Sequence, residues 1–191
     1  MTSPYRSELL ALARRAVRAA AENAPAPRAD PSRLEAWMRE PGCCFVTLRT
    51  LDGRLRGCIG RLEPDLPLHE CVVQSAIAAA SRDPRFEPVR PDEVDALRIE
   101  IHVLGPTRRV HGPSEVEVGR HGVVLRAAGR RGVLLPSVAV EHGLDATRFV
   151  EAVCHKAGLP VDAWRRSDAV LEVFETLSFA EPECGAVDAG G

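Results

Sequence analysis

The 191-residue chain has almost no lysine, no long apolar runs and no surplus of either charge. Its longest apolar stretches, such as Ile77–Ala80, fall far short of the ~20 residues that a membrane-spanning helix needs. The net charge of −2 argues against a general nucleic-acid coat, which requires a basic surplus. Because Lys156 is the only lysine, arginine supplies nearly all of the positive charge, and we attribute the paired arginines mainly to solvation.

Secretion and cofactor signals are also missing. Arg14 and Arg15 interrupt the N-terminal apolar pattern, so no secretory signal is indicated. The chain has six cysteines and is long enough to fold without disulfides, so we expect a cytoplasmic protein with reduced thiols. It contains no P-loop, G-x-G-x-x-G, H-E-x-x-H or G-x-S-x-G motif. The adjacent Cys43 and Cys44 lack zinc-ligand spacing, and we predict neither a cofactor nor a metal site.

Hydrophobic periodicity predicts an α+β order of elements in the first half of the chain. The Asp52-Gly53 pair is a strong hairpin signal, and Asp83-Pro84 should end a helix. The expected elements are helices at Ser7–Glu22, Pro31–Trp37 and Pro67–Ala80, and strands at Cys44–Arg49, Arg54–Gly60 and Leu97–Leu104.

The second half repeats this order. The expected elements are strands at Gly122–Arg126, Gly132–Leu135 and Val170–Phe174, the last continuing toward Leu177, and helices at Pro136–His142 and Ala146–Ala157. Arg56-Gly57-Cys58-Ile59 also lines up with Arg131-Gly132-Val133-Leu134. We therefore predict a two-layer α+β fold with duplicated hairpin-helix-strand units, a mixed or antiparallel sheet and an extra N-terminal helix. A single domain over residues 1–180 would contain repeats at about 43–104 and 118–177, followed by a disordered tail at 181–191.

Cys58 is the principal candidate for chemistry. Two glycines flank its thiol on a strand, where glycine costs stability unless a backbone or a ligand must approach closely. Arg56 and Arg61 would favour the nucleophilic thiolate by lowering its pKa. Val133 occupies the corresponding position in the second repeat, which favours a chemical role for the thiol. The alternative is a small core cysteine beside glycines that shape a bulge.

A catalytic thiol needs a base or an orienting group. His121 is the candidate, because it lies in a glycine-bracketed turn just before the second hairpin; the alternative is a turn histidine in water. Asp83 and Arg85 follow the helix of the first repeat, where Asp83 would pair with Arg85 or with Arg56, or the segment simply stops the helix. His102 is expected on a solvated strand face.

These segments together resemble the AMMECR domain family. The resemblance rests on the six-residue stretch Leu55–Gly60, LRGCIG, and extends over roughly residues 5–180. Further matching segments are SRDPRFEP at 81–88, EVGRHG at 117–122 and CHKAGLP at 154–160, followed by Trp164. Ser137 and His102 depart from the family pattern, which has Gln or Glu at the first position and a small residue at the second.

The resemblance implies an α+β fold with two repeats. Prokaryotic members are often encoded beside Memo-like and radical-SAM proteins, so it also implies a role as one component of a three-part system. The family itself does not name a reaction.

Two functional hypotheses follow. In the first, the protein is an enzyme or accessory protein that uses Cys58 as nucleophile or thiol carrier. Arg56 would stabilise the thiolate or bind an anionic group, and His121 would act as base. Further substrate-binding candidates are Gly57, Gly60, Asp83 and Arg85. In the second, the protein is a non-catalytic module that binds a protein, a peptide or a nucleic acid in a groove between the repeats.

Overall fold

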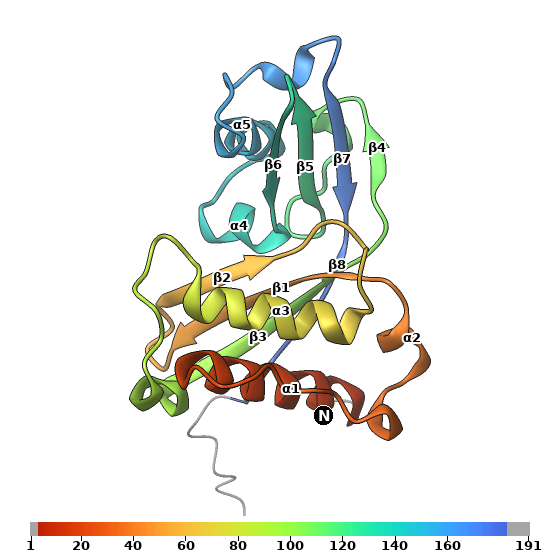
Figure 1. Cartoon of the computed structure of the whole chain (residues 1–191). Coiled ribbons are helices and arrows are strands. Elements are labelled where there is room, and N and C mark those ends of the chain that lie inside the picture. Colours follow the sequence, from red (N-terminus) through yellow and green to blue (C-terminus); the bar gives the residue numbers. More distant parts are fainter. Residues whose placement is uncertain (1–3, 183–191) are drawn as a thin grey trace, which may run out of the picture. The chain divides into compact units, whose positions relative to one another are not determined.

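The computed structural model describes residues 4–182, which form two compact units (Figure 1). The first unit holds residues 4–103 and 178–182, and the second holds Leu104–Leu177. The predicted disordered tail lies outside the described residues, apart from positions 181 and 182. None of the described helices is both long and apolar enough to cross a membrane.

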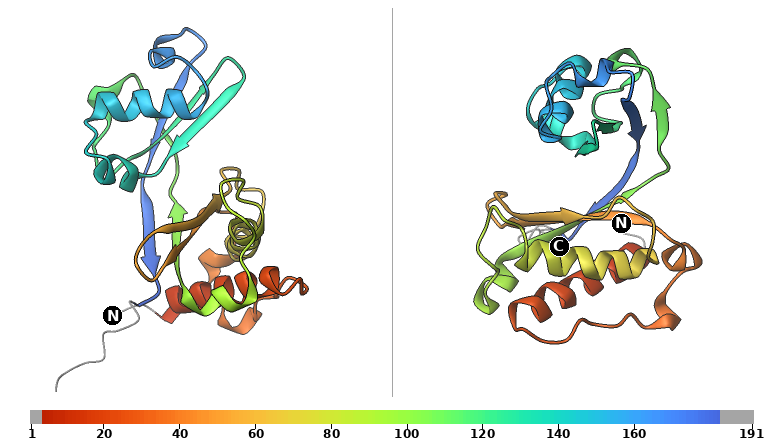
Figure 2. Two further views of the ribbon diagram at one scale, coloured as in Figure 1. Left: turned by 90° about the vertical axis from the view of Figure 1, so that its left-hand side faces the viewer. Right: turned by 45° about the horizontal axis from the view of Figure 1, so that its top comes forward.

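The first unit packs two helices against one side of a four-stranded sheet of order β2-β1-β3-β8 (Figure 2). Its longer elements are α1 (Pro4–Ala21), β1 (Cys43–Thr50), β2 (Leu55–Gly60), α3 (Leu68–Ser81), β3 (Leu97–Leu104) and β8 (Thr176–Ala180). Its short elements are η1 (Pro31–Arg33), α2 (Ala36–Arg39) and η2 (Pro91–Ala96). The buried core joins the apolar faces of α1 and α3 to alternate residues of β1 and β3, as the sequence periodicity predicts.

The second unit has a sheet of order β4-β7-β5-β6, and α5 packs against its β5–β6 hairpin. Its strands are β4 (Arg108–Val110), β5 (Gly122–Ala127), β6 (Arg130–Leu134) and β7 (Val170–Phe174). Its helices are η3 (Pro113–Glu115), α4 (Pro136–Glu141), α5 (Ala146–Lys156) and η4 (Ala163–Arg165).

The duplicated hairpin-helix-strand unit predicted from the sequence is confirmed. In each sheet the strand that follows the helix, β3 or β7, pairs with the first strand of the hairpin. The fourth strand of each sheet comes from the part of the chain that follows the other repeat. β4 follows β3 of the first sheet but joins the second, and β8 follows β7 of the second sheet but joins the first. Neither fourth strand was expected as a separate element, because β4 has only three residues and β8 begins just two residues after the end of β7, so that it reads as a continuation of that strand.

The corresponding glycines of the two repeats have the same packing role. A Cβ atom on Gly57 would lie 2.3 Å from the carbonyl oxygen of Ala79 in α3. A Cβ atom on Gly132 would lie 2.4 Å from the carbonyl oxygen of Val153 in α5. In each unit the glycine therefore lets the helix backbone approach the return strand of the hairpin.

Two predicted elements are organised differently in the structure, beyond shifts of one to three residues at the ends of others. The helix expected at Pro31–Trp37 is instead a 3-10 turn and the four-residue α2, because the backbone is extended at Leu34 and Glu35. The strand expected to continue toward Leu177 ends at Phe174, and a new strand then joins the other sheet. The N-terminal helix is present as predicted, and Arg14 fastens it by donating hydrogen bonds to Glu181 and to two backbone carbonyls.

Candidate functional site

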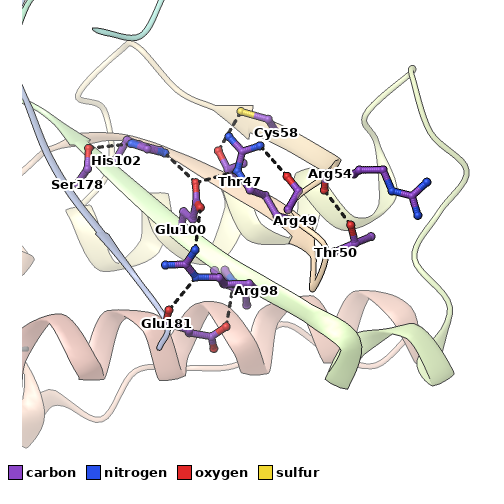
Figure 3. A network of polar contacts seen from close by, with 12 residues as sticks. Thr47, Arg49, Thr50, Arg54, Cys58, Arg98, Glu100, His102, Ser178 and Glu181 are labelled. Carbon is purple, nitrogen blue, oxygen red and sulfur yellow. Dashed lines mark hydrogen bonds and ion pairs between the residues drawn. The ribbon is translucent and has the colours of Figure 1, made fainter. Parts of the chain in front are cut away.

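Cys58 lies in the edge strand β2, on the sheet face that points away from α1 and α3 (Figure 3). It is paired across the hairpin with Thr47, whose hydroxyl donates a hydrogen bond to the Cys58 sulfur at 3.3 Å. The cysteine is partly buried, so its thiol is neither sealed in the core nor freely solvated. It belongs to the polar face of the sheet rather than to the apolar core, which sets aside the core-cysteine alternative.

Asp83 and Arg85 fasten the backbone of Cys58. The buried Asp83 carboxylate accepts a hydrogen bond from the Cys58 N–H at 2.8 Å. Arg85 donates to both oxygens of the same carboxylate, at 2.9 and 2.6 Å, and its Nη2 lies 3.5 Å from the Cys58 carbonyl oxygen. The Arg85 guanidinium lowers the pKa of Asp83 to about 2. The turn after α3 therefore supplies hydrogen-bond partners for the backbone N–H and carbonyl groups of Cys58 at the outer edge of β2.

The expected depression of the Cys58 pKa is wrong. Burial raises the pKa of this thiol, and this effect outweighs the Thr47 hydrogen bond and the electrostatic effects of Arg85 and Arg49. At neutral pH the group is consequently a thiol. The guanidiniums that oppose the increase come from the turn after α3 and from β1, not from the arginines assigned in the sequence.

The guanidinium groups of Arg56 and Arg61 form ion pairs with carboxylates rather than with the Cys58 thiol. Arg56 donates to both carboxylate oxygens of Glu93 at 3.2 Å, and to the carbonyl oxygens of Glu87 and Pro88. Arg61 forms an ion pair with Asp65 at 2.5 Å. Arg56 thus fixes the segment that leads into β3, and the predicted contact of its guanidinium with the thiolate is not found.

Packing also accounts for both glycines of the candidate site. The missing side chain of Gly57 leaves room for α3, and a Cβ atom on Gly60 would lie 2.3 Å from the Phe45 ring and 2.4 Å from the Cys44 carbonyl oxygen. Their predicted contact with a ligand stays a prediction.

His121 belongs to the second unit, where it is buried in the turn before β5. The ring Nδ1 of His121 accepts a hydrogen bond from the backbone N–H of Glu117 at 3.0 Å, and the backbone N–H of His121 donates to the Glu117 carbonyl oxygen at 2.9 Å. The imidazole is therefore buried and hydrogen-bonded within its own turn, and the alternative of a solvent-exposed turn histidine is wrong. Its predicted pairing with Cys58, a residue of the first unit, stays a prediction.

The same sheet face carries a polar network that sequence analysis did not assemble (Figure 3). Glu100 of β3 lies at its centre, within 3.3 Å of Arg49, 3.9 Å of Arg98 and 3.8 Å of His102. His102 is also 2.8 Å from the hydroxyl of Ser178 in β8. The alternation of β3 places Glu100 and His102 on one face, but only strand order shows that Arg49 lies beside them.

This arrangement offers hydrogen-bonding and cationic groups around a protonated thiol. In the described part of the chain, the hydrogen-bond partner of the Cys58 sulfur is the Thr47 hydroxyl, and no histidine or carboxylate side chain is hydrogen-bonded to it. Within residues 4–182, no group of three or more His, Cys, Asp or Glu side chains is placed to hold a metal ion.

We expect Cys58 to be alkylated more slowly than a free small-molecule thiol at pH 7, because its raised pKa leaves less thiolate. Peptide-resolved iodoacetamide labelling of the folded protein measures this rate. Asp83→Asn should accelerate the reaction by removing a carboxylate that raises the pKa of Cys58. Faster labelling of the native protein than of the reference thiol would restore the nucleophile hypothesis.

The fold and site define an α+β protein with a duplicated hairpin-helix-strand unit and a thiol on the polar face of its first sheet. The chain matches the AMMECR1 family over residues 10–179 and belongs to that family.

Relatives and a solved structure agree with this assignment. A protein of Methanopyrus kandleri is 47% identical over 147 residues, covering 73% of this chain and 71% of the relative. A protein of Methanosarcina barkeri is 41% identical over 172 residues, covering 87% and 84%. The crystal structure of an uncharacterized protein from Pyrococcus horikoshii has a TM-score of 0.85 and 35% identity, with 95% of this chain and 93% of that chain covered.

Proposed function

We propose that this protein is a cytoplasmic, non-catalytic binding component whose ligand site is the polar sheet face around Cys58. The observation that carries the proposal is a thiol whose raised pKa keeps it protonated and whose hydrogen-bond partner is a hydroxyl rather than a base. Such a thiol serves as a small, weakly polar contact more readily than as a nucleophile.

An anionic group is the ligand chemistry that the site fits. Arg49 and Arg85 both act electrostatically on the Cys58 thiol, one from β1 and the other from the turn after α3. Arg98 adds a third guanidinium through Glu100. Guanidinium groups suit carboxylate and phosphate, because their planar donors match two oxygens at once.

Inorganic phosphate tests this proposal. Bound phosphate would offset the field of the two guanidiniums, so we expect it to slow alkylation of Cys58 by roughly twofold or more at fixed pH and ionic strength. Arg49→Gln should remove the protection. The matched control is Arg54→Gln, which changes an exposed arginine paired with Asp52 on the same hairpin. Protection that persists in Arg49→Gln, or that chloride reproduces, would contradict an anion site here.

The partners proposed for the protein are Memo-like and radical-SAM proteins, which the family resemblance implies. Co-purification of the tagged chain with such proteins from one host tests the association. Arg49→Gln should weaken it if the polar face is the shared site, and Arg54→Gln should not.

The thiol enzyme remains the second candidate, because Arg85 and Arg49 both favour the thiolate even though burial outweighs them. Cys58→Ser separates the two functions in a cell that depends on the protein. Retained function with an unchanged melting temperature supports the binding component. Loss of function with stability and partner binding intact supports thiol chemistry.

A further inference from the structure

A second pair of thiols lies in the core of the first unit, on the opposite side of the sheet from Cys58. Cys44 of β1 and Cys71 in the first turns of α3 are both fully buried, and their sulfur atoms are 3.3 Å apart. The Ser75 hydroxyl, one helical turn further on, is 3.8 Å from the first sulfur and 4.0 Å from the second. Neither cysteine belongs to the proposed ligand site.

We propose that Cys44 and Cys71 are a modification site, a thiol pair that hydrogen peroxide converts to a disulfide joining β1 to α3. The sulfurs are already in van der Waals contact, and bond formation brings them to about 2.0 Å. The two sulfurs therefore have to approach each other by a little more than an ångström.

The electrostatic surroundings give the two sulfurs different roles. The Cys44 thiol donates a hydrogen bond to the Cys71 sulfur, and this lowers the pKa of Cys71 to about 7. The same contact raises the pKa of Cys44, and burial raises it further. Arg61 adds a smaller effect that favours the Cys71 thiolate. Cys71 is therefore the attacking sulfur and Cys44 the resolving one.

The reaction balances with peroxide as the only oxidant. The Cys71 thiolate attacks one peroxide oxygen, an S–O bond forms, the O–O bond breaks, and hydroxide leaves and is protonated to water. The Cys44 sulfur then loses its proton and attacks the Cys71 sulfenic acid. The S–S bond forms as the S–O bond breaks, and a second water leaves. The two thiols lose two electrons in total, and peroxide gains them.

The disulfide would close a loop around the whole β1–β2 hairpin, including Cys58. Cross-linking a loop of this size restricts the unfolded chain, so oxidation should raise the melting temperature by several degrees. Reduction with dithiothreitol should reverse the change.

The full-length reduced protein is the material for the test. It is exposed to hydrogen peroxide, its remaining thiols are blocked with N-ethylmaleimide, and non-reducing peptide mapping locates the cross-links. We expect a linked Cys44–Cys71 peptide, absent from Cys71→Ser and retained in both Cys43→Ser and Cys184→Ser. Its rate of formation should rise about tenfold per pH unit below pH 7 and level off above, following the Cys71 thiolate.

Cys154 provides an internal reference, because it is as fully buried as the pair but burial raises the pKa of its thiol, whereas the pKa of Cys71 is lowered. It should be modified much more slowly than the pair. Equal modification of Cys154 would show that peroxide acts on unfolded chains, and this would overturn the proposal. A folded protein that oxidises at Cys58 or Cys43 without forming the Cys44–Cys71 link would overturn it as well.

Discussion

Replacing Asp83 by alanine is expected to lower the free energy of unfolding by about 3 kcal/mol. The buried carboxylate accepts hydrogen bonds from the Cys58 N–H and from the Arg85 guanidinium, and its side chain is only 2% exposed. Its loss leaves a strand N–H and an arginine without their partner. Denaturant unfolding followed by circular dichroism measures the change.

The same carboxylate should make the protein sensitive to acid. The folded-state pKa of Asp83 is about 2, below the ordinary value of 3.8, so the ionised form stabilises the fold at every pH above the unfolded value. That stabilisation, roughly 2 kcal/mol, is lost as the pH falls from about 4 to 2. Asp83→Asn should lack this part of the acid transition.

Asp92 is the matched control. It forms an ion pair with Arg90, also two residues away, but both side chains are about 70% exposed, with values of 72% and 70%. Asp92→Ala should therefore change the stability far less than Asp83→Ala does. If Asp83→Ala and Asp92→Ala lowered the free energy of unfolding equally, the buried hydrogen bonds between Asp83 and β2 would stabilise the fold no more than an exposed ion pair does.

Gly57→Ala is expected to destabilise the protein by about 3 kcal/mol, because its new methyl group would lie 2.3 Å from the backbone oxygen of Ala79. Neither β2 nor α3 can yield at this point without disturbing the core beneath the sheet. Gly132→Ala should have a comparable effect in the second unit, where the oxygen belongs to Val153. Thermal and denaturant unfolding measure both.

Gly53→Ala separates steric overlap from the general cost of replacing a glycine. Nothing lies within 4 Å of its Cβ position, and the only penalty comes from its φ of +84°. We expect a loss of about 1 kcal/mol there. A Gly57→Ala protein that unfolds like the parent but fails to bind its partners would show that this glycine makes room for a ligand rather than for α3.

The two motifs that carry the family resemblance are parts of one structural element. Cys58 of LRGCIG and Asp83 and Arg85 of SRDPRFEP are 25 and 27 residues apart in the chain, yet their groups are hydrogen-bonded or within 3.5 Å. Arg56 adds a second connection by holding Glu93 and the preceding backbone. Several residues of the two motifs therefore form hydrogen bonds along the outer edge of β2, the strand that carries the Cys58 thiol.

Cys58, Asp83 and Arg85 stand out in the sequence because unusual residue types are grouped at strand and helix ends, and the structure brings them together while their roles in binding or catalysis stay predictions. The expected contact of Arg56 with the Cys58 thiolate is wrong, because proximity along the chain does not show which way a guanidinium points; the side chain turns toward Glu93. Its binding of an anionic group stays a prediction. No local pattern connects Arg49, Glu100 and Ser178, since these residues come from three strands brought together by the order β1-β3-β8.

The sequence by itself determined the duplicated fold, because hydrophobic period, hairpin turns and helix stops are local properties of the chain. The N-terminal helix and the Leu97–Leu104 strand were likewise determined locally, the latter with its observed bounds. Only the tertiary structure decided the protonation state of Cys58 and the contact between Cys44 and Cys71. Both depend on burial and on distances between atoms far apart in the chain, which no local pattern encodes.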